Sequence, residues 1–316
     1  IIIPQEKYDK TIPIDGAIAF DGDGDGVSAA AIWLMQNPGR YAVFTNKRKD
    51  KRDLVREVND AIPSKYLSGK HVAVLDVSAE QNMLSLEQMA ENGIEADFID
   101  HHTGLETYLP SKIRDYSKPD SRELSTSSLA YEVLKGGLDE IQKQKAVKLA
   151  VLGMANDGKG RGAKSLFSEN IPEKEMQKLL YFGKVLNYAA CLGNTLDFSE
   201  ILQGLSENAD IVKYLEESPV AGVAQEMEDS SKQLKRRVKS IGRNGITTYF
   251  FPRETEKDVI LGLASYSNYL NDLAGHFPHG NFMGILGTED GKTRFSIRGT
   301  NAKKVARYFA SHYGAE

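Results

Sequence analysis

The first half of the chain alternates short apolar runs with longer amphipathic segments. Apolar runs of strand length occur at residues 16–20, 41–45, 71–77 and 95–102. Between these runs, apolar residues recur at helical spacing over residues 28–35, 54–62 and 84–93. Strands that alternate with helices are typical of βαβ units, so this half is expected to form a parallel sheet covered by helices.

The second half is mainly helical and then changes to short strands. Helical spacing predicts helices over residues 124–134, 139–152 and 173–202, a long charged helix over 220–242, and a closing helix over 302–313. Apolar and β-branched runs predict strands within residues 245–252, 258–266 and 282–299. The last of these ranges is expected to be a hairpin, because its Asp290-Gly291 pair suits a tight turn.

This change of pattern suggests two domains. We expect a first domain over residues 1–195, a helical linker over 196–242 and a second domain over 243–316. The length of 316 residues is sufficient for two hydrophobic cores. We therefore predict an α/β protein whose parallel-sheet domain is joined by a long helix to a smaller α/β domain.

Composition narrows the class of protein. With 41% hydrophobic and 27% charged residues the chain is typical of globular proteins, and its net charge of −4 gives no general basic field for nucleic acid, although a local basic groove stays open. No apolar run is long enough to cross a bilayer, so no membrane is expected. The single cysteine, Cys191, excludes an internal disulfide and favours a reducing cytoplasm.

Three carboxylates, Asp21, Asp23 and Asp25, follow the first predicted strand and are separated only by glycines. An EF-hand loop would need a glutamate at its twelfth position, where Ile32 stands, and it would follow a helix rather than a strand. A glycine-rich phosphate loop is disfavoured because three aspartates repel phosphate. Since like charges so close need a cation between them, the segment predicts a divalent metal site.

Further candidate ligands follow other predicted strands or helices. Asp76 ends one strand, Asp100, His101 and His102 end another, and Asp157 follows a helix. Taken singly, such aspartates are ordinary cap or turn residues. The carboxyl ends of parallel strands, however, meet at one edge of a sheet. Aspartate and histidine without cysteine suit manganese better than structural zinc, and two metal ions that share a carboxylate are a recurrent apparatus for cleaving phosphoesters.

Basic residues neighbour two of these segments. One group spans residues 47–49, and the other comprises Lys159, Arg161 and Lys164. Contact with substrate phosphate and a plain solvated face both remain open for them, and Lys159 and Arg161 are the substrate-binding candidates.

Four motifs together resemble those of the DHH phosphoesterase superfamily. They read DGDGDGVSA, VLDVS, IDHHTG and GMANDGKG, and they occur in the first half of the chain in the order of the family. That superfamily includes RecJ-type exonucleases, nanoRNases, cyclic-dinucleotide phosphodiesterases, manganese pyrophosphatases and exopolyphosphatases. The resemblance implies a DHH domain followed by a DHH-associated substrate-binding domain.

The resemblance also implies a pair of Mn²⁺ ions, with Mg²⁺ or Co²⁺ as alternatives. The implied ligands are Asp21, Asp23 and Asp76 for one ion, and Asp25, Asp76, His101 and Asp157 for the other. Asp76 would bridge the ions, and His102 resembles the position that faces the scissile phosphate. Many members carry a histidine where this chain has Ala19, and the presence of Asp21 instead looks more like the RecJ-type branch.

The resemblance extends to the substrate side of the site. The segment STSSLAYEVL resembles a family helix start near phosphate, which makes Thr126 a candidate contact, although plain capping explains it equally well. The segment FSIRG resembles a strand of the DHH-associated domain and makes Arg298 a candidate phosphate contact. A glycine-rich loop is expected beyond Glu316, unless the protein lacks it. His276 and His279 are expected in a loop and not as ligands.

These expectations combine into a function: a manganese-dependent phosphodiesterase that cleaves short oligonucleotides or dinucleotides, cyclic ones included, with hydroxide activated by two ions. The expected catalytic residues are Asp76, His102 and Arg298. Alternatives are a RecJ-like 5′–3′ single-strand exonuclease, an exopolyphosphatase or pyrophosphatase, and a binding protein without catalysis. The expected partner is a small phosphate-containing substrate or a short single strand, and a homodimer is left open.

Overall fold

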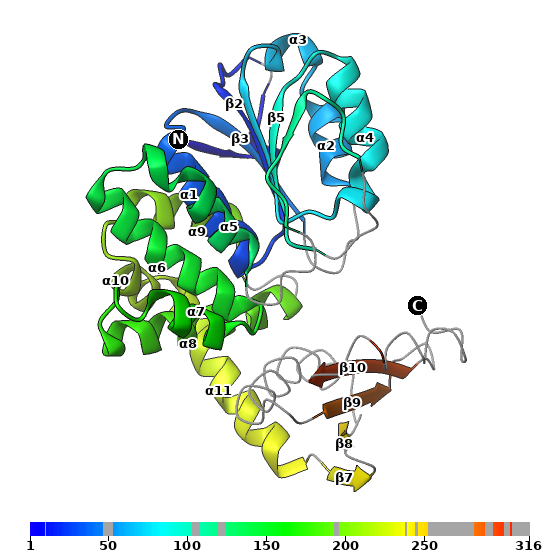
Figure 1. Cartoon of the computed structure of the whole chain (residues 1–316), viewed down its shortest axis with the longest axis vertical. Coiled ribbons are helices and arrows are strands. Elements are labelled where there is room, and N and C mark those ends of the chain that lie inside the picture. Colours follow the sequence, from blue (N-terminus) through cyan, green and yellow to red (C-terminus); the bar gives the residue numbers. More distant parts are fainter. Residues whose placement is uncertain are drawn as a thin grey trace. The chain divides into compact units, whose positions relative to one another are not determined.

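A computed structural model describes most of the chain. The described residues are 1–9, 11–46, 53–102, 108–118, 124–192, 196–237, 239–243, 246–251, 281–287, 293–299 and 304. The chain divides into two compact units, Ile1–Ala221 and Gly222–Glu316, which are coloured blue to green and yellow to red in Figure 1. The division falls inside the predicted linker.

The first unit contains a sheet of six parallel strands in the order β1-β3-β2-β4-β5-β6. The strands are β1 Ile2–Pro4, β2 Gly16–Phe20, β3 Tyr41–Thr45, β4 His71–Leu75, β5 Ala96–Ile99 and β6 Ile113–Asp115. The predicted strands at residues 16–20 and 41–45 are confirmed residue for residue. Those predicted over 71–77 and 95–102 are shorter, because Asp76 and Asp100 already lie beyond the sheet.

The order of the strands reverses at β2. The chain passes from β2 to β3 on one side and then returns to β4 on the other, so that Phe20 pairs with both Thr45 and Leu75. Connections that leave such a strand in opposite directions open a crevice at the carboxyl ends, where open α/β sheets bind ligands. The loops that follow β2 and β4 both begin at this carboxyl edge of the sheet.

Helices cover both faces of the sheet (Figure 1). The helices α2 Leu54–Ala61 and α4 Ala79–Glu91 lie on one face, with the short α3 Ser64–Leu67 near them, and α1 Gly24–Gln36, α5 Thr126–Leu134 and α9 Phe198–Glu207 lie on the other. Buried side chains such as Phe44, Val74, Leu86 and Met89 join the sheet to α2 and α4. This core holds the strand ends in fixed positions.

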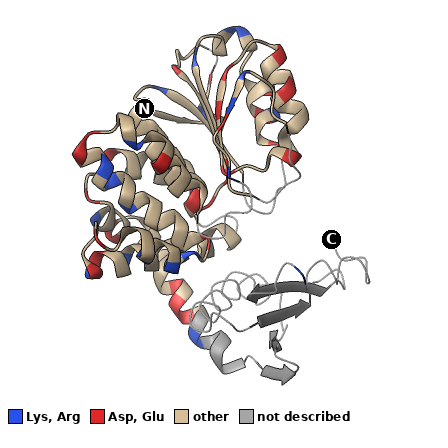
Figure 2. Ribbon diagram, in the orientation of Figure 1, with Lys and Arg blue, Asp and Glu red and all other residues tan. Residues whose placement is uncertain are grey.

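More helices pack outside α1 and α5. They are α6 Glu140–Asn156, α7 Gly160–Phe167, α8 Glu173–Leu192 and α10 Ile211–Glu217, and α6 contacts α1, α5 and α8. The helical structure predicted over 173–202 corresponds to two separate helices, α8 and the start of α9, and the side chain of Asp197 caps α9. In Figure 2 both signs of charge are spread over these helices, while the strands in the middle of the sheet carry few charges.

The second unit is a mixed sheet that follows a helix. It comprises α11 Pro219–Arg237, which begins at the end of the first unit, and the strands β7 Lys239–Arg243, β8 Ile246–Phe251, β9 Asn281–Gly287 and β10 Thr293–Gly299 in the order β10-β9-β8-β7. The antiparallel pair β9–β10 confirms the strand pairing of the predicted hairpin, whose turn at Asp290-Gly291 lies outside the described residues, and β8–β9 is parallel.

Two predictions for this unit turn out differently or cannot be compared. The long helix predicted to residue 242 ends at Arg237, because residues 239–243 pair with β8 as strand β7. The strand predicted over 258–266 lies outside the described residues, as does the closing helix apart from Lys304, which is helical. Among the described residues, no helix has the length and apolar composition needed to cross a membrane.

Candidate metal centre

The acidic segment after β2 forms the start of α1. Asp23 is the N-cap, and its Oδ1 atom accepts hydrogen bonds from the backbone N–H groups of Asp25 (2.9 Å) and Gly26 (3.1 Å). The helix therefore begins at Gly24, four residues before the predicted start at Ser28. Asp25 lies in the first turn, where the positive end of the helix dipole stabilises a carboxylate.

Glycines allow this segment to fold tightly. A Cβ atom at Gly26 would lie 2.2 Å from the backbone oxygen of Asp21, and one at Gly22 would lie 1.9 Å from the backbone oxygen of Asn46. Since real Cβ atoms do not approach so closely, larger residues would force the loop open. The glycines thus bring Asp21, Asp23 and Asp25 to one place.

Asp76 follows β4 and has an unusual backbone. Its φ angle is +58°, in the left-handed region, which costs a residue with a Cβ atom about 1–2 kcal/mol. Its N–H group donates to the backbone oxygen of Ile99 at 3.0 Å. Its buried Oδ1 atom accepts a hydrogen bond of 2.8 Å from the hydroxyl of Thr126. Strain of this kind is concentrated at functional sites, and here it accompanies a buried carboxylate.

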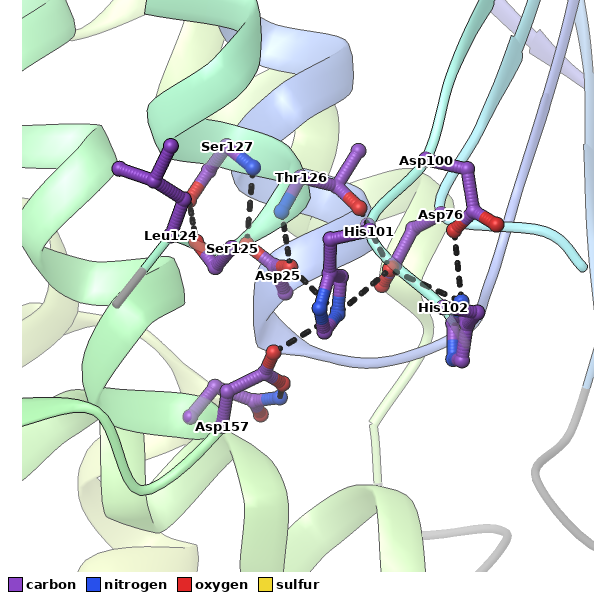
Figure 3. A network of polar contacts seen from close by, with 12 residues as sticks. Asp25, Asp76, Asp100, His101, His102, Leu124, Ser125, Thr126, Ser127 and Asp157 are labelled. Atoms are coloured by element: carbon purple, nitrogen blue, oxygen red, sulfur yellow. Dashed lines mark hydrogen bonds and ion pairs between the residues drawn. The ribbon is translucent and has the colours of Figure 1, made fainter. Parts of the chain in front are cut away.

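His101 lies among three carboxylates from separate segments (Figure 3). Its Nε2 atom is 2.9 Å from Oδ2 of Asp157, 3.6 Å from Oδ1 of Asp76 and 3.7 Å from Oδ2 of Asp25. These acids follow α6, follow β4 and begin α1, respectively. The structure therefore brings residues from all four motifs together at the carboxyl end of the sheet, next to β2.

Among the described residues, possible ligand atoms form three overlapping groups, and the atoms of each group lie within 4.8 Å of one another. The groups are Asp21, Asp23 and Asp76; Asp25, His101 and Asp157; and Asp76, His101 and His102. The first two correspond to the two ligand sets implied by the family resemblance, apart from the sharing of Asp76. Carboxylate and imidazole donors so arranged fit a hard or borderline divalent ion.

The N-terminus of α5 holds the acids in place. Thr126 N–H donates to Oδ2 of Asp25 at 2.7 Å, and Ser127 N–H donates to Oδ1 at 2.9 Å (Figure 3). Thr126 is fully buried, and both its N–H and its hydroxyl bind carboxylates. The sequence left this helix end open as a phosphate contact or as plain capping, and in the structure its N–H groups donate to the carboxylate of Asp25. Substrate contact by Thr126 stays a prediction.

Charge is unevenly distributed in the cluster. Burial raises the pKa of Asp76 well above its usual value, and the neighbouring charges of Asp25, Asp23, Asp157 and Asp21 raise it further. Burial also raises the pKa of Asp157, but the hydrogen bond to His101 and the charge of Lys159 outweigh it, so this pKa is lowered. A cation between the acids would offset the repulsion that Asp76 experiences.

His102 lies at the more exposed side of the cluster. Its Nδ1 atom lies 2.6 Å from Oδ1 of Asp100 and 3.8 Å from Oδ1 of Asp76. Burial lowers the pKa of His102, but the hydrogen bond and charge of Asp100, together with Asp157 and Asp21, raise it to about 9. The side chain is 43% exposed, so a charged imidazole is accessible to an anion.

The basic candidates occupy different positions. Lys159 Nζ donates to the backbone oxygen of Leu124 (2.5 Å), contacts Nδ1 of His101 (2.8 Å) and pairs with Oδ2 of Asp157 (3.3 Å), so it lies against the acids rather than toward solvent. Arg161 is exposed near the start of α7. Arg298 lies on β10 opposite Phe282, and its side chain is outside the described part of the structure, as are residues 47–49, His276 and His279.

Sequence reasoning missed two groups at the site. One is the pair of backbone N–H groups, of Thr126 and Ser127, that donate to Asp25. The serine-rich start of α5 was the feature of the sequence that could have indicated them. The other is Asn156, whose buried side chain contacts both Asp23 and Asp157. Its position directly before Asp157 in the fourth motif was the signal that could have identified it.

The structure defines a class: a doubly wound α/β protein with an aspartate–histidine cluster at the point where strand order reverses. Residues 17–155 match the DHH family, N-terminal domain. That range contains the first three acidic motifs, so residues 17–155 are identified as a DHH domain. No curated protein sequence matches the chain.

Solved structures share the fold. A DHH domain described as a member of a family of ribosomal proteins has a TM-score of 0.62 at 14% identity, covering 93% of this chain and 77% of that one. Exonuclease RecJ bound to manganese has a TM-score of 0.55 at 15% identity, covering 91% and 78%. CDC45 from Entamoeba histolytica has a TM-score of 0.51 at 10% identity, covering 99% of this chain and 92% of that one. At such identities the likeness concerns the fold alone.

Proposed function

We propose that this chain is a metal-dependent phosphodiesterase that cleaves short oligonucleotides or dinucleotides, cyclic ones included. The observation that carries the proposal is the position of His101, whose Nε2 atom lies within 3.7 Å of carboxylates from three segments. The match of residues 17–155 to the DHH family supports hydrolysis of a phosphoester. The RecJ structure bound to manganese supports the same kind of ion here.

The acids would hold two manganese ions. Asp21, Asp23 and Asp76 would bind one ion, Asp25, His101 and Asp157 the other, and Asp76 would be shared. When bound, divalent ions lower the pKa of water and polarise phosphoryl oxygens. The burial and mutual repulsion of these carboxylates favour such a pair, since each ion replaces the hydration that the acids lack.

The other residues would bind and orient the substrate. Asp100 holds His102 by its Nδ1 atom, so that the positively charged ring donates its Nε2–H to a phosphate oxygen. That contact strengthens as negative charge develops on the phosphoryl group. We propose Arg298 and Arg161 as further phosphate contacts, because arginine binds phosphate with two parallel hydrogen bonds. Lys159 contributes through His101 and Asp157.

A RecJ-like single-strand exonuclease is the second candidate. It is favoured by Asp21, which stands in the first motif while Ala19 occupies the position of the histidine found in many family members. Against a long substrate, the sequence shows no stripe of alternating aromatic and basic residues for stacking bases. Short substrates therefore remain the main proposal.

Cytoplasmic location is part of the proposal. The chain has one cysteine, Cys191, and the first unit is held together by a buried apolar core rather than by disulfides. Proteins of this kind do not depend on an oxidising compartment.

The test is an assay with four substrates and Mn²⁺: a 5′-labelled dinucleotide, a long single strand, cyclic di-AMP and polyphosphate. We expect cleavage of the dinucleotide or the cyclic dinucleotide, lost on chelation. Preference for the long strand would establish the exonuclease, and preference for polyphosphate would establish a polyphosphatase. Manganese binding without cleavage of any substrate would indicate a binding protein.

A matched pair of variants links the activity to the cluster. His101→Gln should lower cleavage by more than about 100-fold, since even loss of an outer partner of a metal ligand costs about 10–100-fold. His71→Gln is the control, because His71 is exposed at the start of β4. Equal activity of both variants would refute the role of His101.

A further inference from the structure

Asn156 joins two motifs that lie far apart in the sequence. It is the last residue of α6, and its side chain is buried, with 3% of the residue exposed. Its Nδ2 group donates to Oδ2 of Asp23 at 3.0 Å and to Oδ1 of Asp157 at 3.3 Å, and its Oδ1 atom accepts from Gly24 N–H at 3.0 Å. One amide therefore contacts the acidic loop after β2 and the acid after α6.

These three contacts require an amide. Two of them need a donor, because Asp23 and Asp157 are carboxylates, and the third needs an acceptor for a backbone N–H group. An aspartate would supply no donor, and a lysine or arginine would supply no acceptor. A neutral amide also leaves the negative charge of the two acids undiminished, so they stay available to a cation.

Asn156 completes the anchoring of Asp23. The Oδ1 atom of Asp23 already accepts the two N–H groups that begin α1, while Oδ2 is held by Asn156. Each carboxylate oxygen has two lone pairs, so these bonds fix the plane of the carboxylate and still leave acceptor capacity. The remaining lone pair of Asp23 can therefore bind a metal ion together with Asp21 and Asp76, whose possible ligand atoms lie within 4.8 Å of that of Asp23.

Close packing leaves the amide little room to move. A Cβ atom at Gly24 would lie 2.8 Å from Oδ1 of Asn156, and one at Gly183, on α8, would lie 3.0 Å from its backbone nitrogen. The loop after β2 therefore packs directly against the side chain, and α8 packs against the backbone. Glycine at both places permits an approach that any other residue would prevent.

We propose that Asn156 is a positioning residue that sets the geometry of the metal centre by holding Asp23 and Asp157 in a fixed relation. The inference rests on the proposed metal-dependent function. Removal of an outer partner of a metal ligand lowers metal affinity by about 10–100-fold. We expect a loss of this size when the amide is removed, because the carboxylate of Asp23 is then free to turn.

The experiment compares two buried asparagines. Asn156→Ala is matched by Asn82→Ala, since Asn82 is also buried, accepts from Val55 N–H at 3.3 Å and donates to the backbone oxygen of Ser78 at 2.9 Å. Each full-length variant is titrated with Mn²⁺ by calorimetry, and its metal-free form is unfolded with urea. Both should lose stability, but only Asn156→Ala should lose manganese affinity, by about 10–100-fold.

A further variant and the unchanged chain make the outcomes distinct. Asn156→Ser keeps a polar group that is too short for all three contacts, and it should lose affinity even if Asn156→Ala does not fold. Unchanged affinity in a folded variant, or an equal loss in Asn82→Ala, overturns the role of Asn156. Absence of manganese binding by the unchanged chain overturns the proposed function itself and this inference with it.

Discussion

The sheet edge and the helical layer of the first unit contribute different groups to one cluster. Loops that follow β2, β4 and β5 supply acids and imidazoles, among them Asp23, Asp76 and His101. Helix ends supply mainly the groups that hold them, such as Thr126 and Asn156. Most candidate ligand atoms therefore come from the edge of the sheet, with Asp157 at the end of α6 as the exception, and the groups that orient them lie at the ends of α5 and α6.

The two regions also differ in strain and charge. On the sheet side, a buried carboxylate has a left-handed backbone and a raised pKa, as Asp76 shows. On the helical side, N–H and hydroxyl groups donate to those carboxylates in ordinary helix-start geometry. The crowded carboxylates on the sheet side favour a bound cation. The donors on the helical side stabilise these carboxylates despite their burial and mutual repulsion. Changing each region separately should therefore have effects of different kinds.

The largest effect is expected on the sheet side, from Asp76→Asn. Cleavage should fall by more than about 100-fold, because the shared ligand is lost. The metal-free protein should become more stable at neutral pH. The folded-state pKa of Asp76 is raised above 3.8, so the ionised acid destabilises the fold increasingly as pH rises above that value, and asparagine removes this penalty. Asparagine also tolerates the left-handed backbone.

Cleavage assays and urea unfolding of the metal-free protein at several pH values test this prediction. Asp60→Asn is the control, since Asp60 lies exposed on α2. A loss of stability in Asp76→Asn that is constant with pH would contradict the raised pKa. Full activity with manganese would contradict the bridging role.

A smaller effect is expected on the helical side, from Thr126→Val. Valine has nearly the same shape but no hydroxyl, so Asp76 loses its 2.8 Å hydrogen bond while the N–H group still reaches Asp25. Manganese affinity should fall by about 10–100-fold, measured by calorimetry. Ser127→Ala is the control, because that hydroxyl contacts Ser125 and the backbone oxygen of Ala150 instead. Equal affinities in both variants would count against Thr126.

Most of the sheet could be predicted from the sequence. The strands β2 and β3 are short apolar runs with clear ends, and they are confirmed residue for residue. The start of α1 could not be predicted, because Gly24 and Gly26 are poor helix formers and only the capping bonds of Asp23 reveal the first turn. The edge strands β1 and β6 are three residues each, which is too short for a periodic pattern.

The same difference applies to the candidate site. Ends of parallel strands share an edge, so a position after a strand was enough to bring Asp76 and His101 together in the prediction. The groups that hydrogen-bond to these acids could not be located from the sequence in this way. Backbone N–H donors at α5 are the same whatever the side chain, and the neutral amide of Asn156 resembles any turn residue. The depth at which Lys159 lies could not be predicted either, since its contacts come from separate segments.

The smallest effect concerns the pair of Asp100 and His102. The pKa of His102 is raised from 6.5 to about 9. The stabilisation of the fold by the charged His102–Asp100 pair is therefore fully present below pH 6.5 and is lost as pH rises through 9. Asp100→Asn should therefore destabilise the metal-free protein more at pH 6 than at pH 9.5, by on the order of 1 kcal/mol for a partly exposed pair. Urea unfolding at both pH values measures this difference.

Asp97→Asn is the control, because Asp97 pairs with Arg114, which stays charged throughout. If Asp100→Asn lost the same stability at both pH values, the imidazole would not be the charged partner, and the proposed phosphate contact of His102 would lose its basis.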